Sequence, residues 1–305
     1  MPKAGRHHRP RGHAARSGCG AGDHGQSRTA RGPWTFRTHC GKIEASQRSG
    51  GIHTSDWNPK QYLKFEAQRT QPSLDLAVRL RRYAPKSILD LGCGPGNSTA
   101  VLREVFPDAA LCGLDSSQNM IDKARAAHPA LSFRLGDVQA LEGTYDLLFS
   151  NACLQWLPDH RRLLPHLMHS LNDGGVLAVQ IPMNPDEPLF RIIRQTAADP
   201  KWELKNVFFE VNETLESRDY FDILAGCASD FEIWETVYHH RMPSHAALLD
   251  WVRSTRLRPY LDALDEAAGA QFEAEILEAA KRAYPVMQNG EIDFRFRRFF
   301  FIAVK

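Results

Sequence analysis

The sequence predicts an α/β fold, in which a seven-stranded, mostly parallel sheet carries helices on both faces and a small helical cap. Two observations predict it. From Ser87 onward, short apolar runs alternate with stretches of helical periodicity, which is the order typical of a parallel sheet. The apolar runs are continuous rather than alternating, as strands that are buried on both faces require.

Each predicted strand is a short apolar run, and the predicted helices have apolar residues at helical spacing. The predicted strands are 87–91, 110–115, 131–135, 145–150, 174–181, 231–239 and 295–304. The helices expected beside them are 60–82, 97–106, 117–127 and 159–171. The connection between the last two strands is long and mostly helical, so we expect a cap at about 243–290.

The first 54 residues differ in composition from the rest of the chain. They hold ten basic and two acidic residues, a net charge of +8, and contain no Leu or Val. The other 251 residues carry 28 basic and 34 acidic residues, a net charge of −6. A segment so poor in aliphatic side chains cannot bury enough apolar surface to offset its ordering entropy. We therefore expect 1–54 to be a disordered basic extension rich in Gly, Arg and His, and 55–305 to be the folded domain.

Composition also excludes several classes of protein. The chain has no run of about 18 apolar residues and no apolar secretory core, so we expect no membrane partner. Its six cysteines form no CxxC pair and no zinc-type spacing with histidine, which favours reduced thiols in a cytoplasmic protein without a metal. The acidic body would repel a polyanion, so we expect no nucleic-acid partner. The oligomeric state stays open.

A glycine-rich loop is the strongest functional signal. Residues 90–97 read Asp-Leu-Gly-Cys-Gly-Pro-Gly-Asn, after a predicted strand and at the start of a predicted helix. Glycines there permit a tight turn and let the backbone approach a ligand closely. Asp115 ends the next strand, where a carboxylate can accept hydrogen bonds from both hydroxyls of a ribose. The sequence therefore predicts a nucleoside cofactor at the carboxyl ends of the strands.

Two cofactors fit an acid at that place, and the loop favours one of them. A dinucleotide needs its pyrophosphate on the helix N-terminus, with a G-x-G-x-x-G pattern. Here Asn97 stands at the sixth position, Pro95 removes a backbone donor, and Asp90 would repel a pyrophosphate. The same carboxylate would attract the ammonium of S-adenosyl-L-methionine, which carries no phosphate. S-adenosyl-L-methionine is the predicted cofactor, and a nicotinamide cofactor is the alternative.

The ends of the third and fourth strands supply further candidate cofactor-binding residues. Asp137 can accept from the adenine amino group while Val138 packs on the ring, and Asn151 and Ala152 follow the fourth strand, close to the sulfonium. Trp156 could form a wall of the site. The predicted cofactor-binding residues are Tyr62, Arg69, Asp90, Gly92, Cys93, Gly94, Asn97, Asp115, Ser116, Met120, Asp137, Val138, Asn151, Ala152 and Trp156.

With these motifs, the sequence resembles class I S-adenosylmethionine-dependent methyltransferases, whose sheet is Rossmann-like. More narrowly it resembles the trans-aconitate 2-methyltransferases. The stretches that carry this resemblance are 56–59, 62–69, 90–99, 151–160, 174–180 and 257–260. The resemblance covers essentially all of 55–305.

The resemblance implies transfer of a methyl group to one carboxylate of a small unsaturated tricarboxylic acid. It yields a monomethyl ester and S-adenosylhomocysteine. Three positions depart from the family pattern: 181–184 read Ile-Pro-Met-Asn where the family has M-P-D-N, Arg256 replaces a glycine, and Arg297 replaces a proline. All three lie on the presumed substrate side, so another small acid remains an alternative acceptor.

A carboxylate acceptor is already ionised at pH 7, so the reaction needs proximity and orientation rather than a catalytic base. Arginines suit the non-reacting carboxylates, and Arg258 is the preferred candidate because it stands in a family-like turn. A hydroxyl acceptor would instead want a base, for which His160, His239 and His240 are candidates. The predicted substrate-binding residues are Trp57, Gln155, Tyr238, His240, Trp251, Arg258, Tyr260 and Arg295.

Overall fold

The structure is a computed structural model that describes residues 66–184, 186–207 and 214–305, apart from the side chains of 66–69, 206 and 254. All described residues belong to one compact unit, which lies within Ser55–Lys305. The expected extension 1–54 and the site candidates Trp57 and Tyr62 lie outside the described residues, as does the side chain of Arg69.

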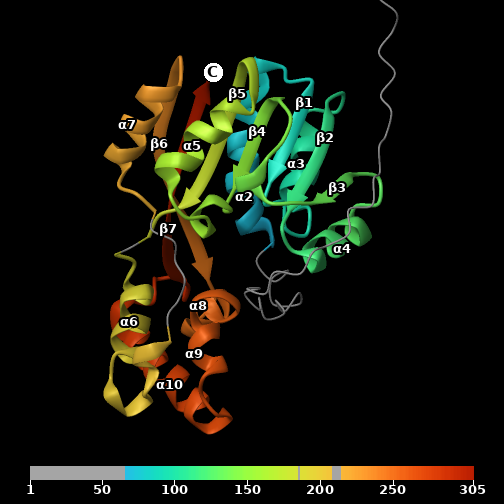
Figure 1. The fold of residues 1–305 in the computed structure, drawn as a ribbon. Coiled ribbons are helices and arrows are strands. Elements are labelled where there is room, and N and C mark those ends of the chain that lie inside the picture. The colour runs from blue at the N-terminus through green and yellow to red at the C-terminus, as the bar shows by residue number, and fades with distance from the viewer. Residues whose placement is uncertain (1–65, 185, 208–213) are drawn as a thin grey trace, which may run out of the picture. The chain divides into compact units, whose positions relative to one another are not determined.

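A single seven-stranded sheet forms the centre of the described chain, in the order β3-β2-β1-β4-β5-β7-β6. The strands are β1 (Ser87–Leu91), β2 (Ala110–Asp115), β3 (Ser132–Leu135), β4 (Tyr145–Asn151), β5 (Leu171–Pro182), β6 (Asp230–Met242) and β7 (Ile292–Val304). The first five run parallel, and β7 is antiparallel to both of its neighbours (Figure 1). This arrangement confirms the predicted fold class.

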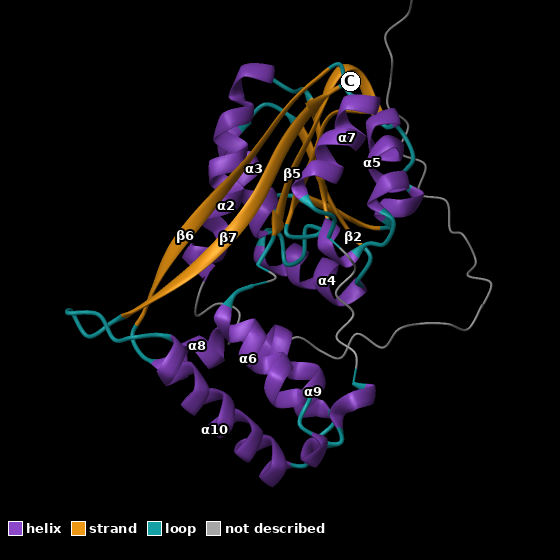
Figure 2. Ribbon diagram, turned by 90° about the vertical axis from the view of Figure 1, so that its left-hand side faces the viewer, coloured by secondary structure: helices purple, strands orange, loops and turns teal. Residues whose placement is uncertain are grey.

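Helices cover both faces of the sheet (Figure 2), because each central strand presents apolar side chains in both directions. On one side, here the α2 face, lie α2 (Glu66–Arg79), α3 (Asn97–Val105) and α4 (Gln118–Ala127). On the other, the α5 face, lie α5 (His160–His169) and α7 (Ser217–Cys227). Short 3-10 helices are η1 (Leu80–Tyr83), η2 (Val138–Ala140) and η3 (Leu154–Trp156).

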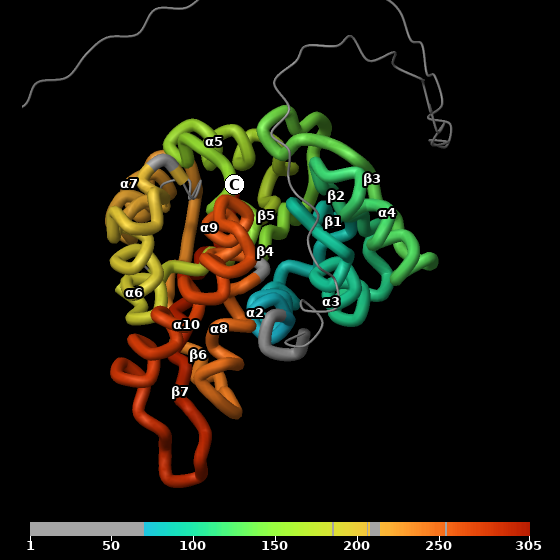
Figure 3. The backbone as a smooth tube through the Cα atoms, turned by 90° about the horizontal axis from the view of Figure 1, so that it is seen from below, coloured from blue at the N-terminus to red at the C-terminus, as the bar shows by residue number. Residues whose placement is uncertain are grey.

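A helical cap lies past the carboxyl ends of the parallel strands (Figures 1 and 3). The strands β6 and β7 pair over their full length, whereas β5 pairs only with the second half of β7, so the first half of β7 continues as a two-stranded ribbon into the cap. Its elements are α6 (Pro188–Ala197), η4 (Pro200–Trp202), η5 (Leu204–Asn206), α8 (His245–Val252), the π-helix η6 (Arg253–Leu257), α9 (Arg258–Asp262) and α10 (Glu266–Ala283).

The cap has a hydrophobic core of its own. Phe272 and Ile276 of α10 pack there with Trp251 of α8 and with Phe294 and Phe296 of β7. The sequence predicted a cap over 243–290, where α8, α9 and α10 lie, but it did not predict α6, which contributes part of the same core. The helix α7 also went unpredicted. None of the helices in the described part of the chain is both long enough and apolar enough to cross a membrane.

Candidate active site

The glycine loop joins β1 to α3 at the carboxyl edge of the sheet. Gly92 and Gly94 both have positive φ angles, of 66° and 54°. A Cβ atom on Gly92 would lie 2.2 Å from the Sγ atom of Cys153, so the loop can pack against the chain after β4 only with glycine there. A Cβ on Gly94 would meet no atom within 4 Å. The two glycines therefore differ: Gly92 is required by packing, and Gly94 leaves open space beside its backbone.

Asp115 links this loop to the end of β2. One carboxylate oxygen accepts a hydrogen bond from the Gly94 N–H at 2.9 Å, and the other accepts one from the Ser117 N–H at 2.9 Å. The side chain is half-buried, Ser116 beside it is exposed, and Met120 on α4 is half-buried. The carboxylate expected to receive ribose hydroxyls is thus oriented by the loop that follows β1.

Asp90 lies beneath the loop and is fully buried. Its Oδ2 accepts hydrogen bonds from the hydroxyls of Ser98 and Thr99, both at 2.6 Å, while its Oδ1 has no hydrogen-bond partner. Burial, opposed in part by these two hydrogen bonds, raises the pKa of Asp90 to about 7. A buried carboxylate with one unsatisfied oxygen, in the loop region that also holds Gly94, fits a cationic group such as an ammonium.

The third strand contributes Asp137 and Val138. Asp137 is exposed and caps η2 by accepting a hydrogen bond from the Gln139 N–H at 2.9 Å. Val138, in contrast, is buried in the hydrophobic core with Leu114 and Leu141. The packing of Val138 on an adenine ring stays a prediction.

The turn after β4 brings together several of the predicted residues. Ala152 has a φ angle of 54°, and its N–H donates to the Gln180 carbonyl at 3.0 Å. The amide of Gln155 donates to the Ala152 carbonyl at 2.6 Å, which holds this turn in place. Asn151 Oδ1 is buried without a hydrogen-bond partner. Trp156 keeps 43% of its surface exposed, so it can border an opening.

The cap candidates lie deeper than the sequence suggested. Trp251 and Tyr260 are buried in the cap core, where Tyr260 lies 5.9 Å from Phe272 between ring centroids. Arg258 begins α9 and forms an ion pair with Asp262 one turn along, with Nε and Oδ2 separated by 3.4 Å. We therefore assign Trp251 and Tyr260 to the packing of the cap.

Arg295 alternates along β7 with buried phenylalanines. The buried side chains Phe294, Phe296 and Arg298 share one side of the strand, whereas Arg295 is exposed on the other side. This buried side of β7 is on the α2 face, where Phe300 of the same strand packs with α2. Arg295 therefore does not share a side with the apolar residues that face the cap.

The ribbon of β6 supplies Tyr238 and His240 to that same side. The Tyr238 hydroxyl donates to Asp75 of α2 at 2.6 Å, and burial together with this carboxylate raises the pKa of Tyr238. His240 is buried, its ring centroid lies 4.8 Å from that of Trp251, and its Nε2 has no hydrogen-bond partner. Burial, with a smaller contribution from Arg298, lowers the pKa of His240 to about 4.

The other two candidate bases, His160 and His239, make contacts in other parts of the structure. His160 is buried on the α5 face, where its Nδ1 lies 2.6 Å from the Tyr220 hydroxyl and its Nε2 lies 2.8 Å from the Leu154 carbonyl. His239 forms an ion-pair contact with Asp293 on the outward side of β6. Of the three, only His240 faces the side shared with Arg298.

Two buried residues lie next to these: Gln180, which sequence reasoning missed, and Arg298, one of several arginines that it counted near the cap but did not select. Gln180 on β5 is fully buried and neither of its amide atoms has a hydrogen-bond partner. Arg298 on β7 is 6% exposed, and its guanidinium carbon lies 4.4 Å from the Phe296 ring centroid. The signal for both was a polar residue interrupting an apolar strand, at 176–181 and at 294–302.

Two of the three departures from the family pattern touch each other. The backbone N–H of Arg297 donates to the side chain of Asn184, and the Arg297 Nε donates to the Met183 carbonyl at 2.8 Å. A proline at position 297 would have no N–H to donate. Contacts between Arg297 and the segment 183–184 therefore join the turn after β5 to strand β7.

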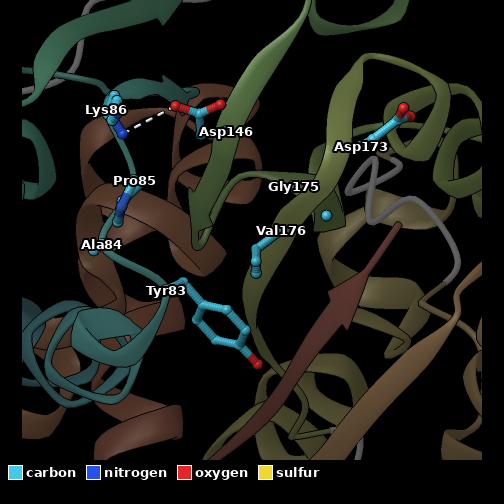
Figure 4. Close-up of a pocket in the computed structure, with 9 residues that line it drawn as sticks. Tyr83, Ala84, Pro85, Lys86, Asp146, Asp173, Gly175 and Val176 are labelled. Carbon is cyan, nitrogen blue, oxygen red and sulfur yellow. Dashed lines mark hydrogen bonds between the residues drawn. The ribbon is translucent and has the colours of Figure 1, made fainter.

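A cavity of about 260 Å³ lies at the opposite end of the sheet (Figure 4). Asp146 borders it at the start of β4 and accepts hydrogen bonds from the backbone N–H groups of Lys86 and Ser87. The Asp146 carboxylate and these two N–H groups are therefore already hydrogen-bonded to one another. The cavity borders the amino ends of the strands. It is separate from the glycine loop. Among the described residues, no group of three His, Cys, Asp or Glu side chains is placed to bind a metal.

Comparison with known proteins agrees with this geometry. A family model described as a methyltransferase domain matches residues 88–175. The trans-aconitate 2-methyltransferase of Methylobacterium radiotolerans is 45% identical over 257 residues, covering 82% of this chain and 99% of that protein. The enzyme of the same name from Escherichia coli O7:K1 is 44% identical over 252 residues, covering 82% and 98%. The crystal structure of YcgJ from Bacillus subtilis shares the fold, with a TM-score of 0.51, 15% identity and coverage of 77% and 98%.

Proposed function

The chain belongs to the trans-aconitate 2-methyltransferase family of S-adenosylmethionine-dependent enzymes, and from that premise we propose that it methylates one carboxylate of trans-aconitate. The products would be a monomethyl ester and S-adenosylhomocysteine. The observation that carries this proposal is 45% identity to a relative of that name over 99% of the relative's length. A nicotinamide reaction is set aside, because the chain is a methyltransferase.

The donor side of the site fits S-adenosyl-L-methionine. When bound, this cofactor supplies a methyl group on a positively charged sulfonium. We propose that Asp115 accepts hydrogen bonds from the ribose hydroxyls and that Asp90 faces the ammonium. Two features support this assignment: Gly94 leaves open space beside its backbone, and Asp90 Oδ1 lacks a partner. We propose that Asp137, which is exposed and follows β3, accepts a hydrogen bond from the adenine amino group.

The acceptor side has to position an anion and needs to move no proton. An acceptor carboxylate is ionised at pH 7. His240, whose pKa is lowered to about 4 by burial, is neutral there and suits orientation better than proton abstraction. Proximity and in-line orientation are then the main contributions of the protein. Cys93 and Cys153 are no competing nucleophiles, since burial raises the pKa of both thiols, that of Cys153 to about 12.

A methyl-transfer assay of the full chain tests the proposal. With saturating S-adenosyl-L-methionine, we expect trans-aconitate to be the best substrate in a panel of mono-, di- and tricarboxylates. Its rate should stay flat above pH 6, since the acceptor is already ionised. If the enzyme prefers a different acid, that acid replaces trans-aconitate as the proposed acceptor, and methyl transfer to a carboxylate stands. A rate that rises with a base's pKa and prefers a hydroxyl would overturn carboxyl transfer.

We propose further that residues 55–305 carry the whole activity, in a cytoplasmic enzyme whose partners are small molecules. The region matched by the relative from Methylobacterium radiotolerans covers 82% of the chain, which is close to the share that 55–305 represents. A variant lacking 1–54 should keep its kcat, KM and melting temperature. A loss of activity or stability in that variant would assign a role to the basic segment, and nuclease treatment of the full chain would show whether nucleic acid contributes.

A further inference from the structure

Three neighbouring strands carry polar side chains on the α2 face, near their carboxyl ends. Asp90 on β1 is paired in register with Phe149 on β4. Asn151, two residues further along β4, is paired with Gln180 on β5. Phe149 packs in the core on the α2 face, and alternation along the strands turns the other three side chains to that same face. We call Asp90, Asn151 and Gln180 the strand-end triplet.

Each member of the strand-end triplet has a buried polar atom without a hydrogen-bond partner in the described part of the chain. These atoms are Asp90 Oδ1, Asn151 Oδ1 and both amide atoms of Gln180. Asp90 and Gln180 are fully buried. Native proteins hydrogen-bond nearly all of their buried polar groups, because an unpaired group loses its hydration without a replacement. Four such atoms on three adjacent strands indicate a place for a polar molecule.

The strand-end triplet lies next to the partly open carboxyl edge of the sheet. Asn151 at the end of β4 is half-buried, and so is Pro182, two residues beyond Gln180 on β5. The glycine loop begins directly after β1, which is the neighbour of β4. Adjacent strands are about 4.8 Å apart, so β1 and β5 lie about 10 Å apart. A methyl donor over β1 and a small acid over β5 would therefore meet at β4, beside Asn151.

The hydrogen-bonding character of the triplet changes from strand to strand. The Asp90 carboxylate suits the ammonium of the methyl donor, and the Asn151 Oδ1 atom suits its positive sulfonium. Gln180 adds two N–H donors, on an amide that has neither end hydrogen-bonded to the described protein. An N–H donor suits an anion. The order therefore matches a cationic donor at β1 and β4 and an anionic acceptor at β5.

We propose that Gln180 binds the reacting carboxylate of the acceptor through its amide N–H groups and turns one carboxylate oxygen toward the methyl group. The proposal rests on the proposed function, and it names the residue that presents the attacking atom. As the oxygen–carbon bond forms, the carbon–sulfur bond breaks and its electron pair stays on sulfur. A carboxylate and a sulfonium become a neutral ester group and a neutral thioether, and no proton moves.

A neutral amide suits this task better than an arginine does. The reacting carboxylate loses its negative charge in the transition state, so a guanidinium would stabilise the ground state more than the transition state and would slow the reaction. An amide N–H fixes the direction of the oxygen through a weaker interaction, so less is lost as the charge disappears. The sequence had suggested Gln155 instead of Gln180, but Gln155 donates its N–H to the Ala152 carbonyl.

The test compares Gln180→Leu with Asn172→Leu, which removes an amide from the opposite end of the same strand. Asn172 donates to Asp146 at 2.7 Å, near the amino end of β5. We expect Gln180→Leu to lower kcat/KM for trans-aconitate by about 10–100-fold, as for the loss of a hydrogen bond to a charged group. The fall in kcat should exceed the rise in KM, because orientation is lost. Asn172→Leu should keep both constants.

Binding of S-adenosylhomocysteine separates this role from a role in holding the cofactor. Its Kd, measured by calorimetry, should stay unchanged in both variants. If Gln180→Leu weakens S-adenosylhomocysteine binding tenfold and keeps the KM for trans-aconitate, the amide belongs to the cofactor and the proposal is overturned.

A second variant, Gln180→Glu, keeps the shape of the side chain and tests the N–H donor directly. Burial raises the pKa of a glutamate at this position, and its protonated form still donates one hydrogen bond. Its rate should therefore fall at least tenfold as pH rises and the glutamate ionises next to the acceptor carboxylate, whereas the wild-type rate stays flat above pH 6. A rate at pH 9 equal to that of the wild type would overturn the proposal.

Failure of the inference can be told apart from failure of the proposed function. If the wild type methylates trans-aconitate and Gln180→Leu keeps its kcat and KM, the inference is wrong and the proposed function stands. If the wild type binds trans-aconitate in its complex with S-adenosylhomocysteine but does not methylate it, and Gln180→Leu binds it more weakly, recognition by Gln180 stands and the proposed function fails. Absence of binding to the wild type overturns both.

Discussion

The two halves of the site hold their polar groups in different ways. In the donor half, at the ends of β1 to β3, Asp115 is held by two backbone N–H groups and Asp137 by one. In the acceptor half, at β5, β6 and β7, Gln180 and His240 keep buried atoms without protein partners. Most polar groups of the donor half therefore also serve the fold, and Asp90 Oδ1 is the buried exception. The acceptor half keeps several buried polar atoms that have no partner in the protein and therefore cost stability.

The largest expected effect lies in the donor half, at Gly92. A Cβ there would lie 2.2 Å from Cys153 Sγ at a φ angle of 66°, so Gly92→Ala combines overpacking with backbone strain. We expect a loss on the order of 3 kcal/mol in the free energy of unfolding, measured by chemical denaturation, together with loss of cofactor binding.

Gly94→Ala is the matched control for this change. Its φ angle is also positive, but its Cβ would meet no atom within 4 Å. It should cost only about 1 kcal/mol in stability through backbone strain. It should still weaken S-adenosyl-L-methionine binding, because its methyl group would fill space that we assign to the cofactor. Equal stability losses in the two variants would mean that the loop tolerates displacement of Cys153, and the contrast between the glycines would disappear.

The donor half could be predicted from the sequence because its residues are close in the chain. The loop 90–97 and Asp115 lie within 26 residues of one another, and each follows a strand whose apolar run was plain. Asp90 shows the limit of that reasoning. Its position at the end of a strand could be predicted, but its complete burial and its hydrogen bonds to Ser98 and Thr99 depend on how α3 folds back over it.

The acceptor half could be predicted only in part, because its residues meet through register between distant strands. Gln180 and Arg298 are 118 positions apart and become neighbours through antiparallel pairing of β5 with β7. The predicted strand 295–304 was three residues short, and a strand's sidedness cannot be assigned without knowing which layer covers it. The sequence indicated that Arg295 alternates with Phe294 and Phe296, but not which of the two sides is buried. The helix α6 was missed for a similar reason, since its partners in α10 lie far along the chain.

The acceptor half should gain stability when a polar group is removed. Gln180→Leu replaces a fully buried amide that has no partner in the protein, and we expect the free energy of unfolding to rise by about 1–2 kcal/mol. The comparison variant is His160→Leu. It removes a buried ring whose two nitrogens are hydrogen-bonded, to the Tyr220 hydroxyl and to the Leu154 carbonyl, so it should lose about 1–3 kcal/mol.

Thermal and urea unfolding of both variants, without substrate, checks this contrast. If Gln180→Leu is destabilised as much as His160→Leu, then the Gln180 amide is stabilised in the free protein, and the idea that the acceptor half gives up stability for binding is wrong. Comparing the two changes in the same protein removes differences in unfolded-state compactness as an explanation, since each replaces one polar side chain by the same leucine.

The last prediction returns to the donor half and concerns pH rather than a packing change. Burial raises the pKa of Asp90 to about 7, above its ordinary value of 3.8, so the free protein holds a proton there that the unfolded chain would release. The unliganded protein should therefore lose stability as pH rises from about 4 to about 7, and then level off. A cationic ammonium favours the ionised carboxylate, so cofactor binding should run the other way.

The association constant for S-adenosyl-L-methionine should accordingly rise about tenfold per pH unit between pH 5.5 and 6.5 and flatten near pH 7. This range lies below that in which an α-amino group deprotonates, so the cofactor's own charge stays constant. Calorimetry in two buffers of different ionisation enthalpy should show one proton released on binding at pH 6. Asp90→Asn should abolish both the slope and the proton release. If Asp90→Asn keeps them, another group titrates, and Asp90 would hold the loop to α3 without facing the ammonium.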